Sequence, residues 1–411
     1  MSLEFRLAKR NIGRNLRRTG LTVAATVFAV FLVVVFVAMA AGMHEKMIED
    51  GVRIHSGHLQ VSGKDYLKKR TLEQFVDLDA ELLTLLEQAP GALGVAPRVI
   101  GFGLASKGAS TQGVAIFGVD PQREGTVSSL PTRVVSGVFV DGEGRGIVLG
   151  ERLARNLGAE IGDELLLYSV AYSMETAYDL FTVVGTLRLP EPALERTLAV
   201  ISLADAQAFF AYGDRVSEIA VLAKDAGHVD ALEADLHAVL AKRGGPELEL
   251  HTWAEVMPEL KQFIFIDDAG MYIMLAILVV VVAFGILNTI LMSVLERTRE
   301  LGVMLALGLK PGSIFRVVYM ESMLLASIGL VIGLALAIPV VLYFQGHPIP
   351  MSEELKGAAQ IIAMEPVITF KLKPLNPLGS MITILGVAAL AALYPALKAS
   401  RARPVDALRS L

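Results

Sequence analysis

Residues 296–308 combine charged and apolar side chains in a pattern typical of a docking helix. The stretch opens with charges and continues with apolar residues at i, i+3 and i+4: Glu296, Arg297, Arg299, Glu300, Leu301, Met304 and Leu305. In a helix this spacing places an apolar stripe beside a charged end, and Gly308 followed by Pro311 predicts where the helix ends. Such a helix can bind in a groove of a protein partner. A solvated turn is the alternative interpretation of the same residues.

The sequence contains no recognisable set of catalytic or metal-binding residues. Residues 57–65 (GHLQVSGKD) come nearest to a phosphate-binding loop, but they have one residue too many between the glycines and an Asp in the hydroxyl position. Residues 142–146 (GEGRG) precede a predicted strand, which is typical of a loop. His55 and His58 have the spacing of a metal pair, but no further ligand joins them. We therefore expect a non-catalytic chain that binds no metal or cofactor directly.

Four windows without a charged residue are long enough to cross a bilayer, which takes about 20 helical residues. They are residues 19–44, 269–295, 322–346 and 374–397. Hydrophobic residues make up 54% of the chain, and we expect an integral membrane protein with four transmembrane helices. Residues 38–40 (AMA) resemble a signal cleavage site, but the apolar run before them exceeds the usual ~7–15 residues, so we predict an uncleaved anchor.

Basic residues predict the orientation of these spans. They cluster before the first span, between the second and third, and after the fourth: Arg6, Lys9, Arg10, Arg14, Arg17, Arg18, Arg297, Arg299, Lys310, Arg316, Lys398, Arg401, Arg403 and Arg409. Positive charge near span ends marks the cytoplasmic side. Residues 1–18 are then a cytoplasmic amphipathic helix or a plain basic flank, and residues 398–411 are a cytoplasmic tail.

The predicted organisation follows from the spans and this orientation. Its successive segments are residues 1–18, the first span 19–44, an extracytoplasmic domain 45–268, the second span 269–295, a cytoplasmic coupling segment 296–316, the third span 317–346, a short extracytoplasmic loop 347–373, the fourth span 374–397 and the tail 398–411. The two termini therefore share the cytoplasmic side.

The large extracytoplasmic segment is strongly acidic. Residues 45–268 hold 20 Lys and Arg against 34 Asp and Glu, a net charge of −14 that the overall value of −5 conceals. Such a surface argues against nucleic acid as a partner. The chain has no cysteine, so no disulfide supports this domain, whose size suffices for an ordinary core.

Short runs of alternating and helical periodicity fill this segment. We predict strands at 57–62, 94–106, 113–119, 147–149, 164–169, 181–187, 197–201, 216–223 and 247–251, and helices at 77–88, 151–157, 202–212 and 229–242. Strands interleaved with a few helices indicate an α+β domain.

Two features of the third span predict contacts with other parts of the protein. Gly329 and Gly333 form a G-x-x-x-G face, which predicts close approach of another helix either within the chain or in a dimer. Glu321 lies about one turn into the span, where we expect it to pair with a basic residue such as Arg316 or to reach water.

The motifs resemble those of a known family. Residues 296–308 (ERTRELGVMLALG) and the ending at 394–409 (YPALKASRARPVDALR) resemble the signatures of FtsX/MacB-type (type VII) ABC transporter permeases. The order of spans and the single large external domain match as well. Within that domain, residues 57–61 (GHLQV), 118–121 (GVDP), 147–151 (IVLGE) and 184–186 (VGT) are similar to the lipoprotein-releasing LolC/LolE permeases.

The resemblance implies a mechanotransmission permease with defined partners. A cytoplasmic ABC ATPase dimer, which supplies ATP and Mg²⁺, would grip the 296–308 segment, and a second permease, identical or paralogous, would complete the complex. The first two spans would hold acyl chains near the outer leaflet through a set of apolar residues: Phe36, Met39, Met43, Met47, Phe263, Ile266 and Met274. Helix–helix packing is the alternative role of this set.

The resemblance also has departures that bear on partners. Residues 169–180 are shorter than the hook that receives a soluble carrier in LolC, so docking of a periplasmic carrier is in doubt, and the loop 345–373 is longer. We expect a permease that extracts lipoproteins or another amphiphile from the bacterial inner membrane. The alternatives are efflux together with an adaptor and an outer-membrane channel, or an FtsX-like regulator of an external hydrolase.

Overall fold

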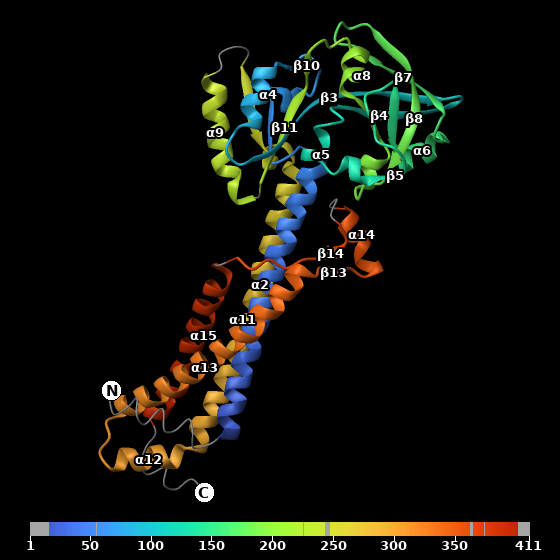
Figure 1. The fold of residues 1–411 in the computed structure, drawn as a ribbon. Coiled ribbons are helices and arrows are strands. Elements are labelled where there is room, and N and C mark those ends of the chain that lie inside the picture. Colours follow the sequence, from blue (N-terminus) through green and yellow to red (C-terminus); the bar gives the residue numbers. More distant parts are fainter. Residues whose placement is uncertain are drawn as a thin grey trace. The chain divides into compact units, whose positions relative to one another are not determined.

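The computed structural model describes residues 16–54, 56–224, 226–242, 247–361, 365–373 and 375–401. The predicted cytoplasmic helix at 1–18 lies outside the described residues up to residue 15, as do His55 and the tail beyond residue 401. The described chain forms two compact units. The helical unit extends to His44 and also contains Ile264–Pro350 and the chain from Val367 onward; the α/β unit comprises Glu45–Phe263 and Met351–Pro366 (Figure 1).

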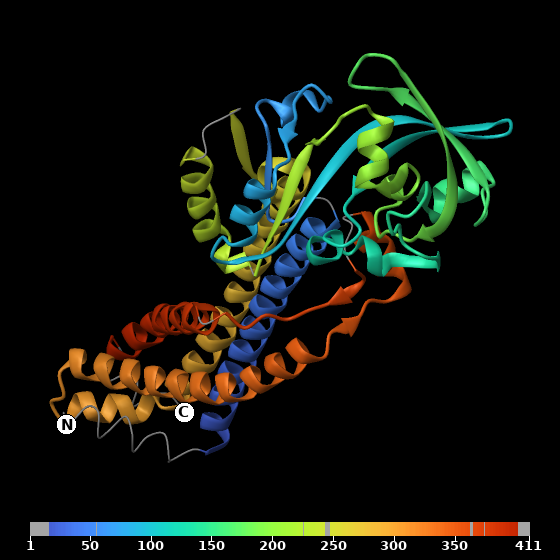
Figure 2. The same cartoon turned by 45° about the horizontal axis from the view of Figure 1, so that its top comes forward.

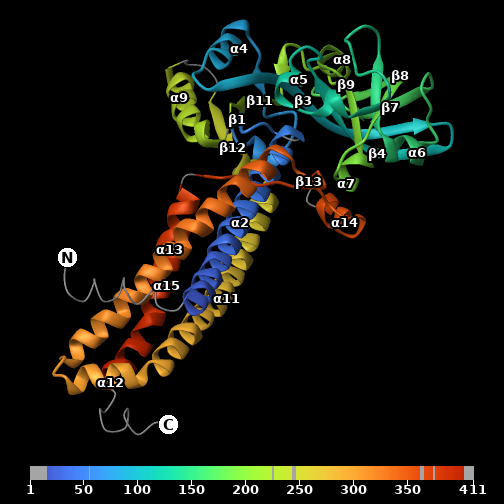
Figure 3. The same cartoon turned by 60° about the horizontal axis from the view of Figure 1, so that its bottom comes forward.

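Among the described residues, four helices are long and apolar enough to cross a membrane, as the sequence predicts. They are α2 (Leu16–Ile54), α11 (Pro258–Glu296), α13 (Pro311–Gly346) and α15 (Leu375–Ser400). A backbone in lipid has no water to bond, so long apolar segments satisfy their amides internally as helices. The short helix α12 (Thr298–Ala306) joins α11 to α13 (Figure 3). The hairpin of β13 (Ile349–Pro350) and β14 (Val367–Ile368) also belongs to the helical unit.

The G-x-x-x-G face of α13 packs against α2 inside the chain. A Cβ added at Gly329 would lie 2.6 Å from Thr26 Cβ, and one added at Gly333 would lie 2.6 Å from Val30 Cβ. Both distances are far below van der Waals contact, so the two glycines are what allow the helices to approach this closely. Of the two hypotheses for this motif, the intrachain one therefore describes the structure, and the face is covered.

The α/β unit is built on a ten-stranded mixed sheet. Its strands are β1 (Leu59–Gly63), β3 (Ala92–Lys107), β4 (Ser110–Val119), β5 (Val134–Gly137), β6 (Gly146–Gly150), β7 (Glu164–Val170), β8 (Thr176–Leu187), β9 (Leu198–Ser202), β11 (Glu218–Ala223) and β12 (Leu248–Thr252). The pairing runs β3–β4–β9–β6–β8–β7, and β7 pairs β3 again at Leu104–Tyr168, so six strands close into a ring. A closed ring leaves no free edge among these strands.

Helices pack on this sheet, and four of them lie in segments where the sequence predicts a helix. The helices are α3 (Tyr66–Lys69), α4 (Ala80–Glu87), α5 (Glu124–Val127), α6 (Glu151–Leu157), α7 (Pro192–Glu195), α8 (Leu203–Phe209), α9 (Val229–Lys242) and α10 (Trp253–Val256), with 3-10 turns η1 (Leu130–Arg133) and η2 (Ala226–His228) and the small pair β2 (Val76–Asp77) and β10 (Arg215–Val216). Ser202 caps α8 by accepting a bond from the Asp205 amide. The prediction of four membrane helices and a large domain that combines strands with a few helices is confirmed.

Two parts of the prediction differ from the structure. The strand predicted at 181–187 is only the second half of β8, which begins at Thr176 and forms a long hairpin with β7 (Figure 2). The loop expected at 347–373 contains α14 (Glu353–Ile361), and its middle part belongs to the α/β unit. Interrupted polarity in both segments hides the elements, because neither shows a sustained period.

Candidate functional site

Helix α12 lies within the predicted stretch 296–308 but begins only at Thr298, because Glu296 still belongs to α11. Arg297 separates it from α11, and Gly308, with a φ of 92°, ends it. The Gly308 amide donates to the Leu305 carbonyl at 3.0 Å, and the Leu309 amide donates to the Met304 carbonyl at 3.1 Å. A left-handed residue closed by such bonds is a common helix terminus, and glycine adopts it without strain. Pro311 then occupies the first turn of α13.

Arg297 fixes the start of α12 to α13. Its Nη1 lies 3.2 and 3.1 Å from the two carboxylate oxygens of Glu321, and its Nε donates to Glu300 at 3.1 Å. The side chains of Arg297 and Glu321 are only 13% and 8% exposed. A guanidinium that bonds both oxygens of a carboxylate is held in one geometry. Glu321 therefore has Arg297 as an ion-pair partner, across 24 residues of sequence.

The apolar stripe of α12 faces the chain's own helices. Leu301 is 5% exposed and belongs to a cluster with Val294, Ile314 and Val318. Met304 and Leu305 are partly buried against the same cluster. The three residues that the sequence singled out for docking thus attach α12 to the helical unit, and in this structure Leu301 is not accessible to a partner.

The opposite side of α12 is exposed and carries its own apolar residues. Val303 is 41% and Leu307 81% exposed, and both follow Arg299 at intervals of four. Residues four apart share one face of a helix. Arg299, Glu300, Val303 and Met304 line a shallow hollow of about 400 Å³. We name Arg299, Val303 and Leu307 the outer face of α12; Glu296 is exposed at the end of α11 just before it.

Sequence reasoning missed Val303 and Leu307 because it assigned the apolar stripe to the partner. The available signal was the second apolar pair at i and i+4, displaced from Leu301 around the helix. The helix therefore has apolar side chains on two sides, and the chain's own helices cover the side of Leu301.

The predicted acyl-chain residues belong to both units and differ in how far they are buried. Met39 packs beside Val341 and Phe370 in the helical unit, whereas Met47 is 3% exposed in the α/β unit. Ile266 and Met274 are 60% and 57% exposed on α11. The remaining residues of the set are half-buried or exposed: Phe36, Met43 and Phe263. Met39 and Met47 therefore have packing roles, and the exposed members lie on α11.

The ends of the first two spans are joined by polar contacts. His44 lies 2.7 Å through Nε2 from Asp267 and 3.1 Å through Nδ1 from Asp268. The two aspartates thus flank one imidazole. This contact connects α2 to α11 within the helical unit.

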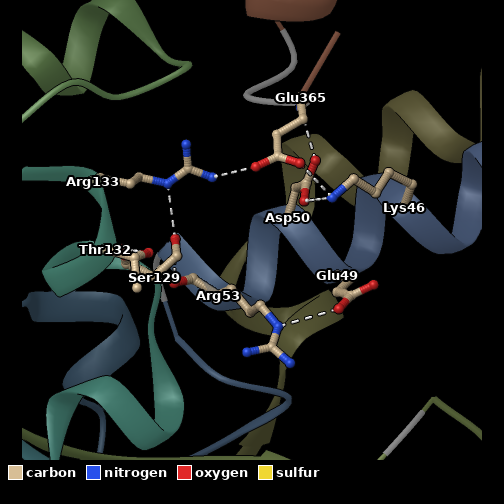
Figure 4. A network of polar contacts seen from close by, with 8 residues as sticks. All are labelled: Lys46, Glu49, Asp50, Arg53, Ser129, Thr132, Arg133 and Glu365. Atoms are coloured by element: carbon tan, nitrogen blue, oxygen red, sulfur yellow. Dashed lines mark hydrogen bonds and ion pairs between the residues drawn. The ribbon is translucent and has the colours of Figure 1, made fainter. Parts of the chain in front are cut away.

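A polar network within the α/β unit holds the segment that carries α14 (Figure 4). Lys46 donates to Asp50 at 2.6 Å and to Glu365 at 2.9 Å, and Arg133 lies 3.4 Å from the other oxygen of Glu365. The Glu365 amide donates to Asp50 at 2.8 Å. The hydrogen bond from Lys46 lowers the pKa of Glu365. Residues separated by 319 positions are thereby linked.

No group of three or more His, Cys, Asp or Glu residues that could hold a metal occurs in the part of the chain that the structure describes. His58 is buried, and its Nδ1 accepts a bond from the Ala223 amide at 3.2 Å. His58 is therefore a structural residue of the sheet.

Two families of known proteins match this chain. The family described as the MacB-like periplasmic core domain matches residues 19–239, more than half of the chain. The family described as the FtsX-like permease C-terminal region matches residues 272–404, which include α12 and its flanking helices.

Individual relatives are similar over most of the chain. The lipoprotein-releasing system transmembrane protein LolC of Neisseria meningitidis is 24% identical over 80% of this chain and 80% of its own length. The corresponding LolE of Haemophilus influenzae is 25% identical over 86% of this chain and 85% of its own. The macrolide export ATP-binding/permease protein MacB of Bdellovibrio bacteriovorus is 24% identical over 97% of this chain and 60% of its own length.

These matches agree with the four membrane helices, the large α/β unit and the connecting helix α12. Permease subunits of this kind are generally non-catalytic. The chain belongs to the MacB- and FtsX-like family of ABC transporter permeases.

Proposed function

We propose that this chain couples ATP hydrolysis by a separate cytoplasmic ATPase dimer to motion of its α/β unit on the opposite side of the membrane. The observation that carries the proposal is the two-sided helix α12. One side is fixed to α13 by Arg297 and Leu301, and the outer face is free to be gripped. Because α12 is attached to α13 in this way, a displacement of α12 by a partner would move the membrane helices rather than unfold α12.

The orientation rests on the basic residues around the connecting segment. Lys310, Arg316 and the arginines of α12 favour the cytoplasm for this end of the helices. The α/β unit is then periplasmic, in a bacterial inner membrane. ATP and Mg²⁺ would bind the ATPase subunits, which meet the permease at the outer face of α12.

The surface of α11 supports a second permease subunit or lipid as its neighbour. Only 11% of its most apolar window is buried, and Ile273, Ile277 and Phe284 are 63%, 56% and 66% exposed. Exposed apolar side chains on a span must face lipid tails or another helix. We propose that an identical or paralogous permease covers part of this surface.

The substrate that we propose is a lipoprotein or another amphiphile of the membrane. Two relatives are named for lipoprotein release, and Ile266 and Met274 provide exposed apolar surface on α11. A soluble carrier is not part of this proposal. The turn between β7 and β8 is tight, with the Ala171 amide donating to the Glu175 carbonyl at 2.9 Å, so the segment that could receive a carrier is short.

Export of a small molecule with an adaptor is the second candidate. The MacB relative, named for macrolide export, aligns with 97% of this chain. Both candidates share the coupling helix and differ in what the α/β unit contacts.

Co-purification tests the coupling directly. An aspartate on the outer face should disrupt a desolvated contact, where a central residue is often worth about 2 kcal/mol or more, roughly thirtyfold in affinity. Val303→Asp in the tagged full-length chain should therefore lose most of the ATPase activity that co-purifies from native membranes. Tyr178→Asp, at a 70% exposed position in the α/β unit, is the matched control. Equal ATPase activity in both variants would contradict the proposal.

A further inference from the structure

Two neighbouring cavities open on one face of the sheet in the α/β unit. The first, of about 300 Å³, is lined by side chains of β1, β3, β4, β11 and the end of α10. The second, of about 480 Å³, follows β3 toward β7. They share Arg70, Ile100 and Phe102 in their walls, so they adjoin along β3. Neither cavity takes part in the coupling proposed above.

The inner end of the first cavity is polar and buried. Gln60 is 1% and Glu218 4% exposed, and Gln60 Nε2 donates to Glu218 at 2.7 Å. Because this bond directs the amide nitrogen to the carboxylate, Gln60 Oε1 is the amide atom left over. No donor among the described residues reaches that oxygen. A buried carbonyl oxygen without a donor is costly, so this oxygen calls for a hydrogen-bond donor from outside the chain.

The buried charges at this end do not balance. Arg98 is fully buried and donates to both oxygens of Glu124, at 3.1 and 2.6 Å. Its Nη1 lies 3.7 Å from Glu218, whose carboxylate therefore shares an arginine that is already paired. One positive charge stands against two negative ones when Glu218 is ionised. Arg70 also faces the cavity but is exposed, so water screens its charge.

The walls leading away from Gln60 and Glu218 are mainly apolar, although the first cavity is also lined by Ser56, Tyr66 and Thr197. Ile100, Phe117 and Met257 line the first cavity, and Phe102 continues into the second, where Tyr168 and Val170 follow. Phe102 is 61% exposed. The two adjoining cavities together form a trough. Its buried end holds the hydrogen-bond acceptors Gln60 Oε1 and Glu218, and mainly apolar side chains line the rest of its length.

We propose that this trough binds a ligand with a primary or secondary ammonium group on an apolar body, the ammonium lying beside Gln60 Oε1 and the Glu218 carboxylate. An ammonium supplies the missing donor to Gln60 Oε1 and the missing positive charge beside Glu218. The acidic surface of the surrounding segment, with a net charge of −14 over residues 45–268, favours the approach of a cation. The inference does not rest on the proposed function, because the site lies wholly within the α/β unit.

The chain contains a built-in reporter for this site. Its single tryptophan, Trp253, lies in α10 one turn before Val256, which lines the first cavity. Energy transfer from Trp253 to a dansyl group therefore reports binding near this cavity. The probe is dansylcadaverine, which has a primary ammonium, and the matched probe is dansylaminohexanoic acid, which has a carboxylate at the same end.

The experiment titrates both probes into full-length protein in lipid nanodiscs. Saturable energy transfer is expected with dansylcadaverine, and at least roughly tenfold weaker binding with the acid, since a carboxylate would face Glu218 without a partner. Glu218→Gln should weaken the binding of dansylcadaverine by a similar factor. Phe102→Ser should also weaken it, and because Phe102 is exposed this variant should fold normally. Tyr178→Ser, which changes an exposed aromatic residue outside both cavities, should bind as the native chain does.

The pH dependence adds an independent check. Burial raises the pKa of Glu218 to about 7, against the opposing effect of Arg98 and with a further increase from Glu124. The amine should therefore bind roughly tenfold more tightly at pH 8 than at pH 6, while Glu218→Gln should lose this dependence. Equal binding of both probes, or unchanged binding in both Glu218→Gln and Phe102→Ser, would overturn the proposal.

Discussion

Two buried acidic side chains, Glu321 in α13 and Glu218 in β11, are each paired with an arginine. Removing one member of such a pair leaves the other charge buried without compensation, which costs about 3–5 kcal/mol. The two pairs differ in their surroundings. Glu321 bonds an arginine through both oxygens, whereas Glu218 competes with Glu124 for Arg98.

The Arg297–Glu321 pair predicts the local stability of α12. The chain has no native cysteine, so Leu301→Cys places one buried thiol beneath the helix. In that background Glu321→Gln should raise the rate of thiol labelling at least roughly tenfold, because α12 opens more often. Exchanging the charges, with Arg297→Glu and Glu321→Arg together, should restore slow labelling. The same rate in the presence and absence of Glu321→Gln would show that the pair does not hold α12.

Glu218 predicts how the stability of the α/β unit depends on pH. Its pKa is raised from the ordinary value of 4.5 to about 7. The folded state therefore binds the proton more tightly than the unfolded state. This contribution is complete below pH 4.5 and is lost as the pH rises through about 7. Thermal unfolding of the full-length protein, followed by Trp253 fluorescence, should show a larger loss of Tm between pH 5 and pH 8 in the native chain than in Glu218→Gln. Parallel Tm curves would contradict this assignment.

At the scale of elements, the close contact of α13 with α2 determines how the helical unit packs. Gly329 and Gly333 meet Thr26 and Val30 at distances that exclude a methyl group. Adding one should cost about 1–3 kcal/mol because the contact cannot expand without displacing a helix. The close approach also removes the glycine face from any dimer interface in this conformation.

A matched pair of alanine variants tests this packing. Gly333→Ala should lower the thermal stability of the purified protein, while Gly346→Ala, at a position in the same helix with open space around it, should leave packing unchanged. Equal stability of the two variants would show that α2 and α13 are not closely packed. Increased dimerisation in Gly333→Ala would likewise contradict an intrachain role.

Elements with a clear local signal could be predicted from the sequence, but their contacts could not. Helix α6 spans Glu151–Leu157 as predicted, because a strand and Gly158 delimit it on both sides. The stripe at Leu301 shows that one face of α12 is covered without revealing what covers it. The pairing of β7 with β3 and the bond from Lys46 to Glu365 join distant residues, and no local period encodes either. The Gln60–Glu218 cavity was missed for the same reason.

The whole molecule consists of a helical unit and an α/β unit. The chain passes from one unit to the other within α2, within α11 and at both ends of the α14 segment. The family consists of transporter permeases. We propose that another subunit supplies the energy and binds the outer face of α12.

Site-directed photocross-linking tests whether an ATP-binding subunit contacts the outer face of α12. A benzophenone maleimide attached to Val303→Cys should, on illumination of native membranes, form an adduct with an ATP-binding subunit, and the same reagent on Tyr178→Cys should not. Since the chain has no other cysteine, each label has one position. An adduct with an ATP-binding subunit at Val303→Cys alone is the predicted result. If no such adduct forms at Val303→Cys, or if it forms at Tyr178→Cys instead, the proposed contact between the ATPase and α12 is contradicted.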